Sequence, residues 1–345
     1  MVDAIQSEIV ARKEEINVPI QTIYFGGGTP SLLTLIQIEK LLDAIRQHYK
    51  IESDPELTLE ANPEDLNPEK SKALFNLGVN RLSIGIQTFD ENKLQWMNRI
   101  HSATDARNAF ENARQAGFEN ISLDLIYAIP DHDQKEWEQD LESLTKLAPE
   151  HITLYGLPIE SQTVFGKWEE KGQLHQLSED RAAQQYLFAI SKLNDKGYIQ
   201  YEVSNFGKEG LHSRHNHAYW SGEPYLGVGP GAHSFDGNFT RRFNVRNNAK
   251  YLKEIEENGG YFELEELSNI QRINERILTE LRTKKGIDLR KVEELSDVNL
   301  MSHQAQLIDE LSAQDFIEID NHFLRLKPHG FLVADEIALR LFFPE

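Results

Sequence analysis

The sequence predicts an α/β protein built on a partial (β/α) barrel, followed by a smaller winged-helix-like α+β module. Three observations support this fold class: apolar strand-like segments alternate with amphipathic helical segments, the chain opens on a helical segment without a strand before it, and helices and a hairpin replace the alternation near the C-terminus. Strands that alternate with helices favour a parallel sheet covered by helices, as in barrels.

The predicted strands and helices follow each other in order along the first half of the chain. Strands are expected at residues 20–25, 57–62, 81–87, 120–128 and 151–157, and helices at 36–49, 68–77, 103–116 and 135–147. A helix at 3–16 carries an apolar stripe of Ala4, Ile5, Ile9 and Ile16. Because the edge of a parallel sheet is normally paired or covered, we expect the barrel to lack its first strand and Met1 to be an internal methionine or a late start.

The second half changes character. Residues 201–206 are expected to add a strand, and residues 225–234 (YLGVGPGAHS) a glycine-rich loop of the kind that carries function. Helices at 270–282, around 302–313 and at 330–341, with a hairpin turning at Asn321, predict the winged-helix-like module. The expected regions are a partial barrel at 1–200, a connecting region at 201–260 and the C-terminal module at 261–345.

Composition limits the classes of function. The net charge of −20 is unfavourable for nucleic acid as a partner, and acidic residues in the C-terminal module argue against DNA there. A signal core and a membrane-spanning run are not seen, so a cytoplasmic protein is expected. The 345 residues include no cysteine, which excludes disulfides, thiolate zinc sites and a cysteine nucleophile, and leaves an iron–sulfur cluster without its usual ligands.

The segment GGGTP, residues 26–30, directly follows the strand TIYF. Glycines at the carboxyl end of a parallel strand let a ligand approach the backbone, and the amides there can bind a charged head group. A tight turn without a ligand is the alternative. The segment has neither the GxGxxG nor the GK[ST] pattern, so a dinucleotide or a nucleotide phosphate is disfavoured.

Polar residues at other strand ends favour a ligand pocket. Glu60, Gln87 and Asp124 lie on predicted strands and Arg99 in the loop MNRIHS, all expected at the end of the barrel where active sites lie. The carboxylates can accept hydrogen bonds from hydroxyls or an amine, and Arg99 can bind a carboxylate. Each residue alone would be read as a cap or a surface ion pair.

The segment HNHAYW, residues 215–220, combines histidines with aromatic residues. A neutral imidazole can ligate heme iron, and Tyr219 and Trp220 offer flat apolar surface for a porphyrin. Two other interpretations stay open at this point. His212, His215, His217 and His233 could form a zinc site, or these side chains could only pack a loop against the barrel.

Five segments, YFGGGTPSLL, LEANPEDL, SIGIQTF, NRIHS and DLIYAIP, resemble the radical S-adenosylmethionine (SAM) barrel of the oxygen-independent coproporphyrinogen oxidase family. SNF, RHNHAYW and YLGVGPGAHS resemble its heme chaperone branch. The resemblance implies that SAM contacts Gly27, Gly28, Thr29, Glu60, Gln87, Arg99 and Asp124. It also implies that heme contacts His215, Tyr219 and Trp220, with His215 as the iron ligand, and that residues 261–345 form a C-terminal domain of the coproporphyrinogen oxidase type.

The chain departs from this family at the CxxxCxxC loop, which holds a [4Fe-4S] cluster in the family and has no counterpart here. The resemblance therefore implies a heme chaperone without its cluster, truncated at the N-terminus, that binds heme and SAM and delivers heme to acceptor hemoproteins such as respiratory enzymes. The alternatives are an oxygen-independent coproporphyrinogen III oxidase, which performs a radical decarboxylation in porphyrin biosynthesis, and an inactive fragment. Whether the chain is an enzyme stays open.

Overall fold

The computed structural model describes residues 1–157, 159, 164–257, 259–296 and 298–344. The chain divides into two compact units, each made of segments that are distant in sequence. The first unit comprises Met1–Ile23, Leu33–Glu56 and Arg214–Glu345, and the second comprises Tyr24–Leu32 and Leu57–Ser213. The boundary passes through the first two strands, so the units are connected by continuous strands and are described separately below.

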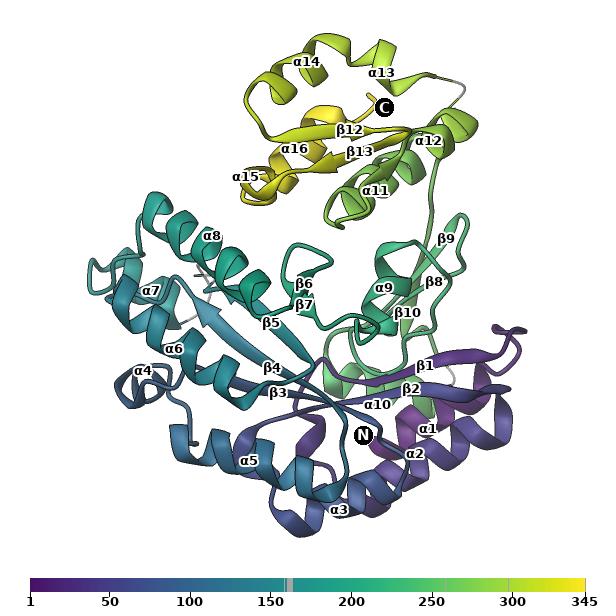
Figure 1. Ribbon diagram of the computed structural model, residues 1–345. Coiled ribbons are helices and arrows are strands. Elements are labelled where there is room, and N and C mark those ends of the chain that lie inside the picture. Colours follow the sequence, from purple (N-terminus) through teal and green to yellow (C-terminus); the bar gives the residue numbers. More distant parts are fainter. Residues whose placement is uncertain (158, 160–163, 258, 297, 345) are drawn as a thin grey trace. The chain divides into compact units, whose positions relative to one another are not determined.

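Seven strands form the main sheet in the order β1-β2-β3-β4-β5-β7-β6 (Figure 1). Their bounds are β1 Ile20–Phe25, β2 Ile51–Ala61, β3 Arg81–Gln87, β4 Asn120–Tyr127, β5 His151–Gly156, β6 Ile199–Gln200 and β7 Asn205–Gly207. Strands β2 to β5 pair in parallel, whereas β7 is antiparallel to both β5 and β6. The five predicted strands and the α/β partial-barrel class are confirmed.

The prediction of one strand over residues 201–206 is wrong, because the chain turns there. The carboxylate of Glu202 accepts hydrogen bonds from the backbone N–H of Ser204 and the side-chain amide of Asn205. The backbone N–H of Tyr201 donates a hydrogen bond to the carbonyl of Asn205 at 3.1 Å. Two short strands, β6 and β7, therefore flank a turn where a single strand was expected.

The parallel strands have one apolar and one polar face. Leu59, Leu82, Leu123 and Ile152 lie on one face and are fully buried. The register places Glu60 opposite Ser83, Ser83 opposite Ser122, and Ser122 opposite His151 on the other face. Successive side chains of a strand point to opposite faces, so every second residue of β2 to β5 belongs to the polar face. That face carries Glu60 and Asp124, two of the candidate SAM residues.

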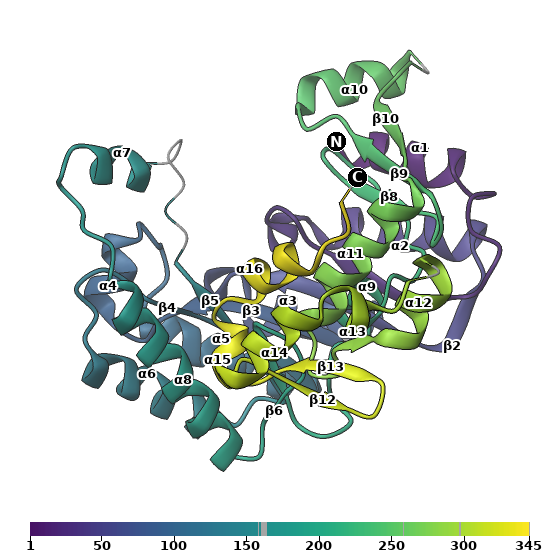
Figure 2. The ribbon, with the colours of Figure 1, turned by 90° about the horizontal axis from the view of Figure 1, so that it is seen from above.

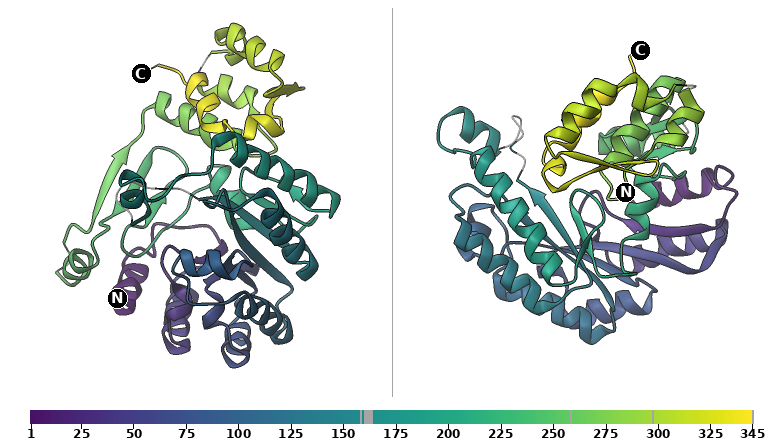
Figure 3. Two further views of the ribbon diagram at one scale, coloured as in Figure 1. Left: turned by 90° about the vertical axis from the view of Figure 1, so that its left-hand side faces the viewer. Right: turned by 45° about the horizontal axis from the view of Figure 1, so that its top comes forward.

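The helices confirm the predicted alternation, and Figure 3 shows several of them side by side along the strands of the second unit. The α-helices are α2 Leu35–His48, α3 Pro68–Asn76, α4 Glu91–Trp96, α5 Ala103–Ala116, α6 Gln134–Leu147, α7 Val164–Glu170 and α8 Glu179–Asp195, with short 3-10 helices at Pro30–Leu32 and Pro63–Asp65. Thr34, Ser102 and Asp133 form capping boxes, which explains why α2, α5 and α6 begin close to the predicted residues.

The first helix, α1 Val2–Ala11, is shorter than predicted and does not include Ile16. Pro19 follows, and a proline favours an extended conformation for the residue before it, so the helix could not continue into β1. The buried face of α1 contains Ala4, Glu8 and Ile9, so a charged residue interrupts the expected apolar stripe. Ala4 packs in one cluster with Tyr251.

A small antiparallel sheet follows the main sheet in sequence, in the order β10-β9-β8. The elements of this part are α9 Arg214–Trp220, β8 His233–Phe235, β9 Thr240–Asn244, α10 Asn248–Glu256 and β10 Phe262–Glu266. Figure 2 shows α10 on the same side of the molecule as α1, in agreement with their shared core cluster. The sequence analysis did not predict this sheet.

The C-terminal part is the expected α+β module, with a three-stranded antiparallel sheet in the order β11-β13-β12. Its elements are α11 Asn269–Leu281, β11 Ile287–Asp288, α12 Leu289–Ser296, α13 Leu300–His303, α14 Ala305–Ala313, β12 Ile317–Asp320, β13 Phe323–Leu326, α15 Pro328–Phe331 and α16 Ala334–Leu341. The hairpin turns at Asn321, whose φ of +57° is the left-handed conformation that asparagine tolerates. The predicted helices at 302–313 and 330–341 are each two helices, since Gln304 and Val333 leave the helical conformation. Within the described residues, no helix has both the length and the apolar character required to cross a bilayer.

Asp140 of α6 is a buried carboxylate whose titration is expected to affect stability. It accepts hydrogen bonds from the hydroxyl of Thr88 (2.5 Å) and the backbone N–H of Phe89 (2.8 Å), and burial raises its pKa to about 6. A carboxyl group with a raised pKa binds more protons in the folded state, so its contribution to stability is lost as pH rises from about 4 through 6. Relative to the native protein, Asp140→Asn should therefore gain about 2 kcal/mol in free energy of unfolding between pH 4 and pH 7.

Urea unfolding of both proteins at several pH values measures this difference. Asp195→Asn, at the exposed end of α8, removes the same charge and serves as the matched control. A difference between native protein and Asp140→Asn that stays constant from pH 4 to pH 7 would contradict the prediction.

Candidate functional site

The glycine loop after β1 is held by the carboxylate near the end of β2. Glu60 accepts a hydrogen bond from the hydroxyl of Tyr24 at 2.7 Å and another from the backbone N–H of Gly27 at 3.2 Å. A Cβ atom on Gly26 would lie 2.8 Å from the Glu60 carboxylate and overlap the Tyr24 ring. Gly27 has a φ of +77°, which favours glycine. Two glycines are therefore required for conformation or space, and Glu60 fixes the loop.

Open space lies beside the rest of this loop. A Cβ atom on Gly27 or Gly28 would meet no atom within 4 Å, and Thr29 is exposed. The backbone can thus be approached closely by a ligand, as the pattern GGGTP predicted. Glu60 is already hydrogen-bonded on both oxygens, so it positions the loop as well as facing the polar side of the sheet.

Asp124 lies on the same polar face, two strands from Glu60. Its carboxylate accepts hydrogen bonds from the hydroxyls of Ser83 (3.1 Å) and Ser122 (3.0 Å). Burial raises the pKa of Asp124, while these hydroxyls and the charge of Arg81 oppose the shift. The structure therefore places Asp124 in a network of hydroxyl groups. Its carboxylate oxygens can accept a further hydrogen bond from a ligand.

Gln87 and Arg99 come together over Gly85 of β3. A Cβ atom on Gly85 would lie 2.6 Å from the side-chain nitrogen of Gln87 and 3.6 Å from the guanidinium of Arg99. Gln87 itself has a φ of +66°, at a register shift between β3 and β4. Burial lowers the pKa of Arg99, against the attraction of Glu64. The absence of a side chain at Gly85 lets both polar groups lie close to the backbone of β3.

The sequence analysis missed several polar residues on this face. Ser122 is hydrogen-bonded to His151 at 2.8 Å, and the other ring nitrogen of His151 is hydrogen-bonded to the Tyr201 hydroxyl at 2.8 Å. Burial keeps the pKa of His151 well below its usual range, so the ring is neutral. The period-2 alternation in SLDLIY and HITLYG carried the signal for this face, because polar residues there alternate with fully buried apolar ones.

The HNHAYW segment, in the first unit, forms helix α9 rather than a loop. The Glu56 carboxylate of β2 accepts hydrogen bonds from the backbone N–H groups of Arg214 and His215, both at 2.9 Å. These N–H groups open the helix and have no partner within it, and a negative charge at this end is favourable. Buried Glu56 therefore fixes where α9 begins.

The ring of His215 is oriented by strand β1. Its Nδ1 atom is hydrogen-bonded to the Thr22 hydroxyl at 2.9 Å, and the side chain is half-buried. Such a bond fixes the ring plane of a metal-ligating histidine, and Nε2 would then be the nitrogen that binds the metal. Thr22 and Glu56 were not predicted, and nothing in their local sequence pattern distinguishes them.

The two aromatic residues of α9 have different surroundings. Tyr219 lies one helical turn after His215, is 47% exposed, and has its ring 5.2 Å from that of Tyr225. The Trp220 ring lies 5.5 Å from Tyr219, with the guanidinium of Arg282 5.6 Å from its centroid. Tyr219 thus shares the side of α9 that carries His215 and offers exposed flat surface there.

The zinc interpretation of the histidines is not supported. The described residues contain no group of three or more histidine, aspartate or glutamate side chains placed to hold a metal ion. The ring of His212 stacks on Tyr201 at 4.5 Å, and that of His233 packs edge-on against Phe243 at 4.7 Å. These contacts give both histidines structural surroundings of their own.

The loop at 225–234 is anchored to Arg12, the residue that follows α1. The Arg12 guanidinium donates to the Gly227 carbonyl at 2.7 Å and to the Ser234 hydroxyl at 2.9 Å. A Cβ atom on Gly227 would overlap the carbonyl of His233, so glycine is required there. The conformation of this glycine-rich loop is therefore explained by its packing.

The residues present fit heme and SAM but not an iron–sulfur cluster. An oriented imidazole beside an exposed aromatic ring suits a heme, and the open glycine loop with polar side chains around it suits SAM. A [4Fe-4S] cluster is held by cysteine thiolates, and the 345 residues contain none. This donor set cannot hold the cluster.

Comparisons with known proteins agree with this fold. Residues 3–144 match the Radical SAM superfamily, and residues 267–333 match the HemN C-terminal domain. The solved structure of coproporphyrinogen III oxidase (HemN) from Escherichia coli, a radical SAM enzyme, has a TM-score of 0.84 at 21% identity and covers 99% of this chain and 82% of that one. The two family-model matches identify a protein of the radical SAM class with a HemN-type C-terminal domain.

Curated relatives indicate which family within the radical SAM class the chain belongs to. "Heme chaperone HemW" from Bacillus subtilis (strain 168) is 36% identical over 97% of this chain and 89% of its own length. HemW from Synechocystis sp. is 35% identical over 83% of this chain and 70% of its own length. The mouse "Radical S-adenosyl methionine domain-containing protein 1, mitochondrial" is 34% identical over 93% of this chain and 75% of its own length. The chain belongs to the HemW family.

Proposed function

We propose that this chain is a heme chaperone that binds heme with His215 as the iron ligand and passes it to acceptor hemoproteins. The observation that carries the proposal is the geometry of α9, where the His215 ring is oriented by Thr22 and the helix start is fixed by Glu56. Membership of the HemW family, whose curated relatives are named heme chaperones, supports it. Tyr219 and Trp220 would contact the porphyrin ring.

SAM binding is part of the proposal. The contacts would come from Gly27, Gly28, Thr29, Glu60, Gln87, Arg99 and Asp124, which lie in the loop or around the polar face of the second unit. SAM supplies an adenosyl group whose radical cleavage requires an electron from a cluster. Since these 345 residues offer no thiolate for the cluster, we include no reductive SAM cleavage and assign no enzymatic activity to this chain.

The alternative activity, oxidative decarboxylation of coproporphyrinogen III, has less support. The likeness to HemN at 21% identity concerns the fold alone. That activity would need the cluster at every turnover, whereas holding heme needs only the histidine and its surroundings. The proposal also includes respiratory enzymes as acceptors of the heme and a cytoplasmic location. It divides the chain into a barrel at 1–200, a heme-motif region at 201–260 and a C-terminal domain at 261–345.

A heme titration followed by visible absorbance tests the proposal. We expect saturable binding with one heme per chain and a shift of the Soret band. Mixing the loaded protein with an apo-hemoprotein should then move the band to that of the acceptor faster than with free heme at the same concentration. Absorbance that rises without saturation would reject heme binding, and loaded protein that never releases heme would reject the chaperone role.

Replacing Thr22 tests how the His215 ring is positioned. Thr22→Ala removes the hydroxyl at Nδ1, so the ring loses its fixed orientation and heme affinity should fall by about 3- to 10-fold, as for the loss of one hydrogen bond. Thr22→Ser keeps the hydroxyl and should restore most of the affinity. The Soret titration measures both variants. Equal losses in both would show that the methyl group of Thr22, rather than its hydroxyl, is what matters.

A further inference from the structure

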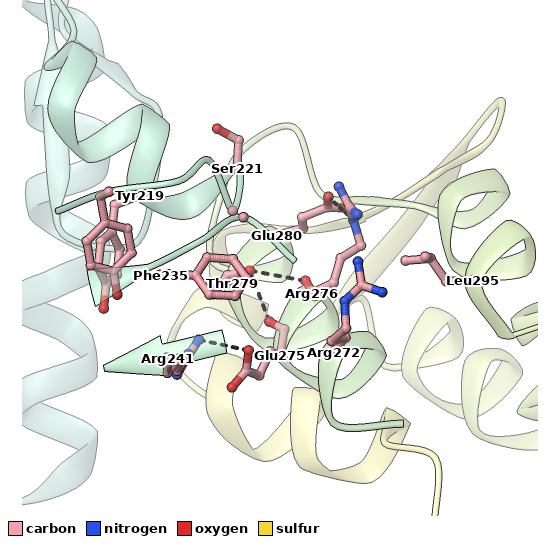
Figure 4. Close-up of a pocket in the computed structure, with 13 residues that line it drawn as sticks. Tyr219, Ser221, Phe235, Arg241, Arg272, Glu275, Arg276, Thr279, Glu280 and Leu295 are labelled. Atoms are coloured by element: carbon pink, nitrogen blue, oxygen red, sulfur yellow. Dashed lines mark hydrogen bonds and ion pairs between the residues drawn. The ribbon is translucent and has the colours of Figure 1, made fainter. Parts of the chain in front are cut away.

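A pocket lies at the C-terminal end of α9, within the first unit (Figure 4). It is lined by Tyr219 of α9, by Arg241 of β9 and by Arg272 and Arg276 of α11. The cavity volume is about 110 Å³, which is small beside the roughly 300–1,000 Å³ of pockets that enclose whole ligands. It can take one arm of a ligand whose remainder lies outside.

The side chains that line this pocket carry more positive than negative charges. Arg241 forms an ion pair with Glu275 at 2.8 Å, and Arg276 forms one with Glu280 at 2.6 Å. Among the ion pairs of the described residues none involves Arg272, whose guanidinium lies 4.0 Å from the centre of the Phe239 ring. Three guanidiniums thus face two carboxylates, with one positive charge left over.

The arrangement of the guanidiniums is costly without an anion. Arg272 and Arg276 are one turn apart on α11, and Figure 4 shows their side chains running alongside each other on the side of Leu295. Like charges at this spacing repel. In addition, the Nε atom of Arg241 is buried and has no hydrogen-bond partner in the described part of the chain. A bound carboxylate would relieve both features.

The location of the pocket indicates which ligand would supply the carboxylate. Tyr219 lines it, and His215 lies four residues earlier on the same side of α9, a rise of about 6 Å along the helix. The chain has a net charge of −20, so an anionic ligand is repelled by most of the surface and needs a local cationic site. Heme bears two carboxylate-bearing propionate arms on one edge of its ring.

We propose that this pocket binds a propionate carboxylate of heme through Arg272, supported by Arg276, while the ring lies toward Tyr219 and His215. The inference rests on the proposed heme binding and adds to it the residues that recognise the acidic edge of the porphyrin. Charge-assisted hydrogen bonds from arginine to a carboxylate are the strong kind, because the planar guanidinium matches both oxygens.

Esterified porphyrins test this directly. In hemin dimethyl ester both arms are uncharged methyl esters, so the native protein should bind the diacid about 10-fold more tightly than the ester, the value expected for a charge-assisted bond. In Arg272→Gln this preference should fall to about twofold or less. Arg272→Lys keeps the charge and should retain part of the preference. Arg181 is exposed on α8, and Arg181→Gln is the matched control for the loss of one positive charge.

Metal-free protoporphyrin IX and its dimethyl ester, followed by fluorescence, repeat the comparison without iron, and circular dichroism confirms that each variant is folded. Equal affinity of the native protein for diacid and ester would overturn this inference and leave the heme proposal standing. An equal loss for both ligands in Arg272→Gln would also overturn it, because the arginine would then act through packing. Failure of every porphyrin to bind saturably would overturn both proposals.

Discussion

Heme added to the His215→Ala variant should leave the Soret band close to that of free heme, whereas the native protein shifts it. The expected loss of affinity is about 30- to 100-fold, or roughly 2–3 kcal/mol, because the imidazole-to-iron bond is removed while the contacts of Tyr219 and the arginine pocket remain. A visible absorbance titration at fixed ionic strength measures both the band position and the dissociation constant.

His217→Ala is the matched control for this experiment. His217 lies on the same helix, two residues later, and is exposed, so its removal changes the same residue type in the same element. We expect a normal titration for it. If His215→Ala binds heme normally, the iron ligand must be sought at His217 or at His233, and the role of α9 in the proposed function would have to be revised.

Glu8→Ala should destabilise the first unit by about 3–5 kcal/mol, the range for removing one partner of a buried ion pair. Glu8 is fully buried and pairs with Arg12 at 2.9 Å, and Arg12 is only 2% exposed. The same carboxylate accepts hydrogen bonds from the Tyr251 hydroxyl at 2.6 Å and the Gly229 N–H at 2.8 Å. The substitution leaves a buried guanidinium and several donors with fewer partners.

Urea or thermal unfolding followed by circular dichroism measures this loss. Glu15→Ala is an informative contrast, because Glu15 also pairs with Arg12, at 2.7 Å, but is 44% exposed, and its removal should cost less than about 1 kcal/mol. If Glu8→Ala and Glu15→Ala cost the same, the buried network at Glu8 does not stabilise the unit in the way its geometry indicates.

The sequence predicted the parallel strands and their helices because each follows a local rule. Apolar residues repeat every two positions in strands or every three to four in helices, and capping residues such as Ser102 and Asp133 indicate where helices begin. The glycine loop was found for the same reason, since GGGTP after an apolar strand is a local signal. Glu60 lies at the glycine loop, and Gln87 and Arg99 lie together beside Gly85 of β3. Their contacts with SAM stay a prediction.

The remaining features depend on contacts between residues far apart in sequence, which no local pattern records. Glu8 was not singled out from the sequence, yet it is the buried partner of Arg12 and of Tyr251, which is 243 positions away. The pocket lined by Arg241, Arg272 and Arg276 brings together residues of α9, β9 and α11. Helix α9 itself was missed because its first turn is completed by Glu56, a residue of β2.

Strand β1 requires a fixed number of residues between Thr22 and Tyr24. Thr22 and Tyr24 are two positions apart, so they share a face of the strand, and the first orients His215 while the second holds Glu60 at the glycine loop. One residue inserted between them would turn their hydroxyls to opposite sides, so that only one of the two hydrogen bonds could form. Insertions before Ile20 leave this spacing unchanged. In homologous chains, length variation should therefore occur outside this short interval even where the identities of neighbouring residues drift.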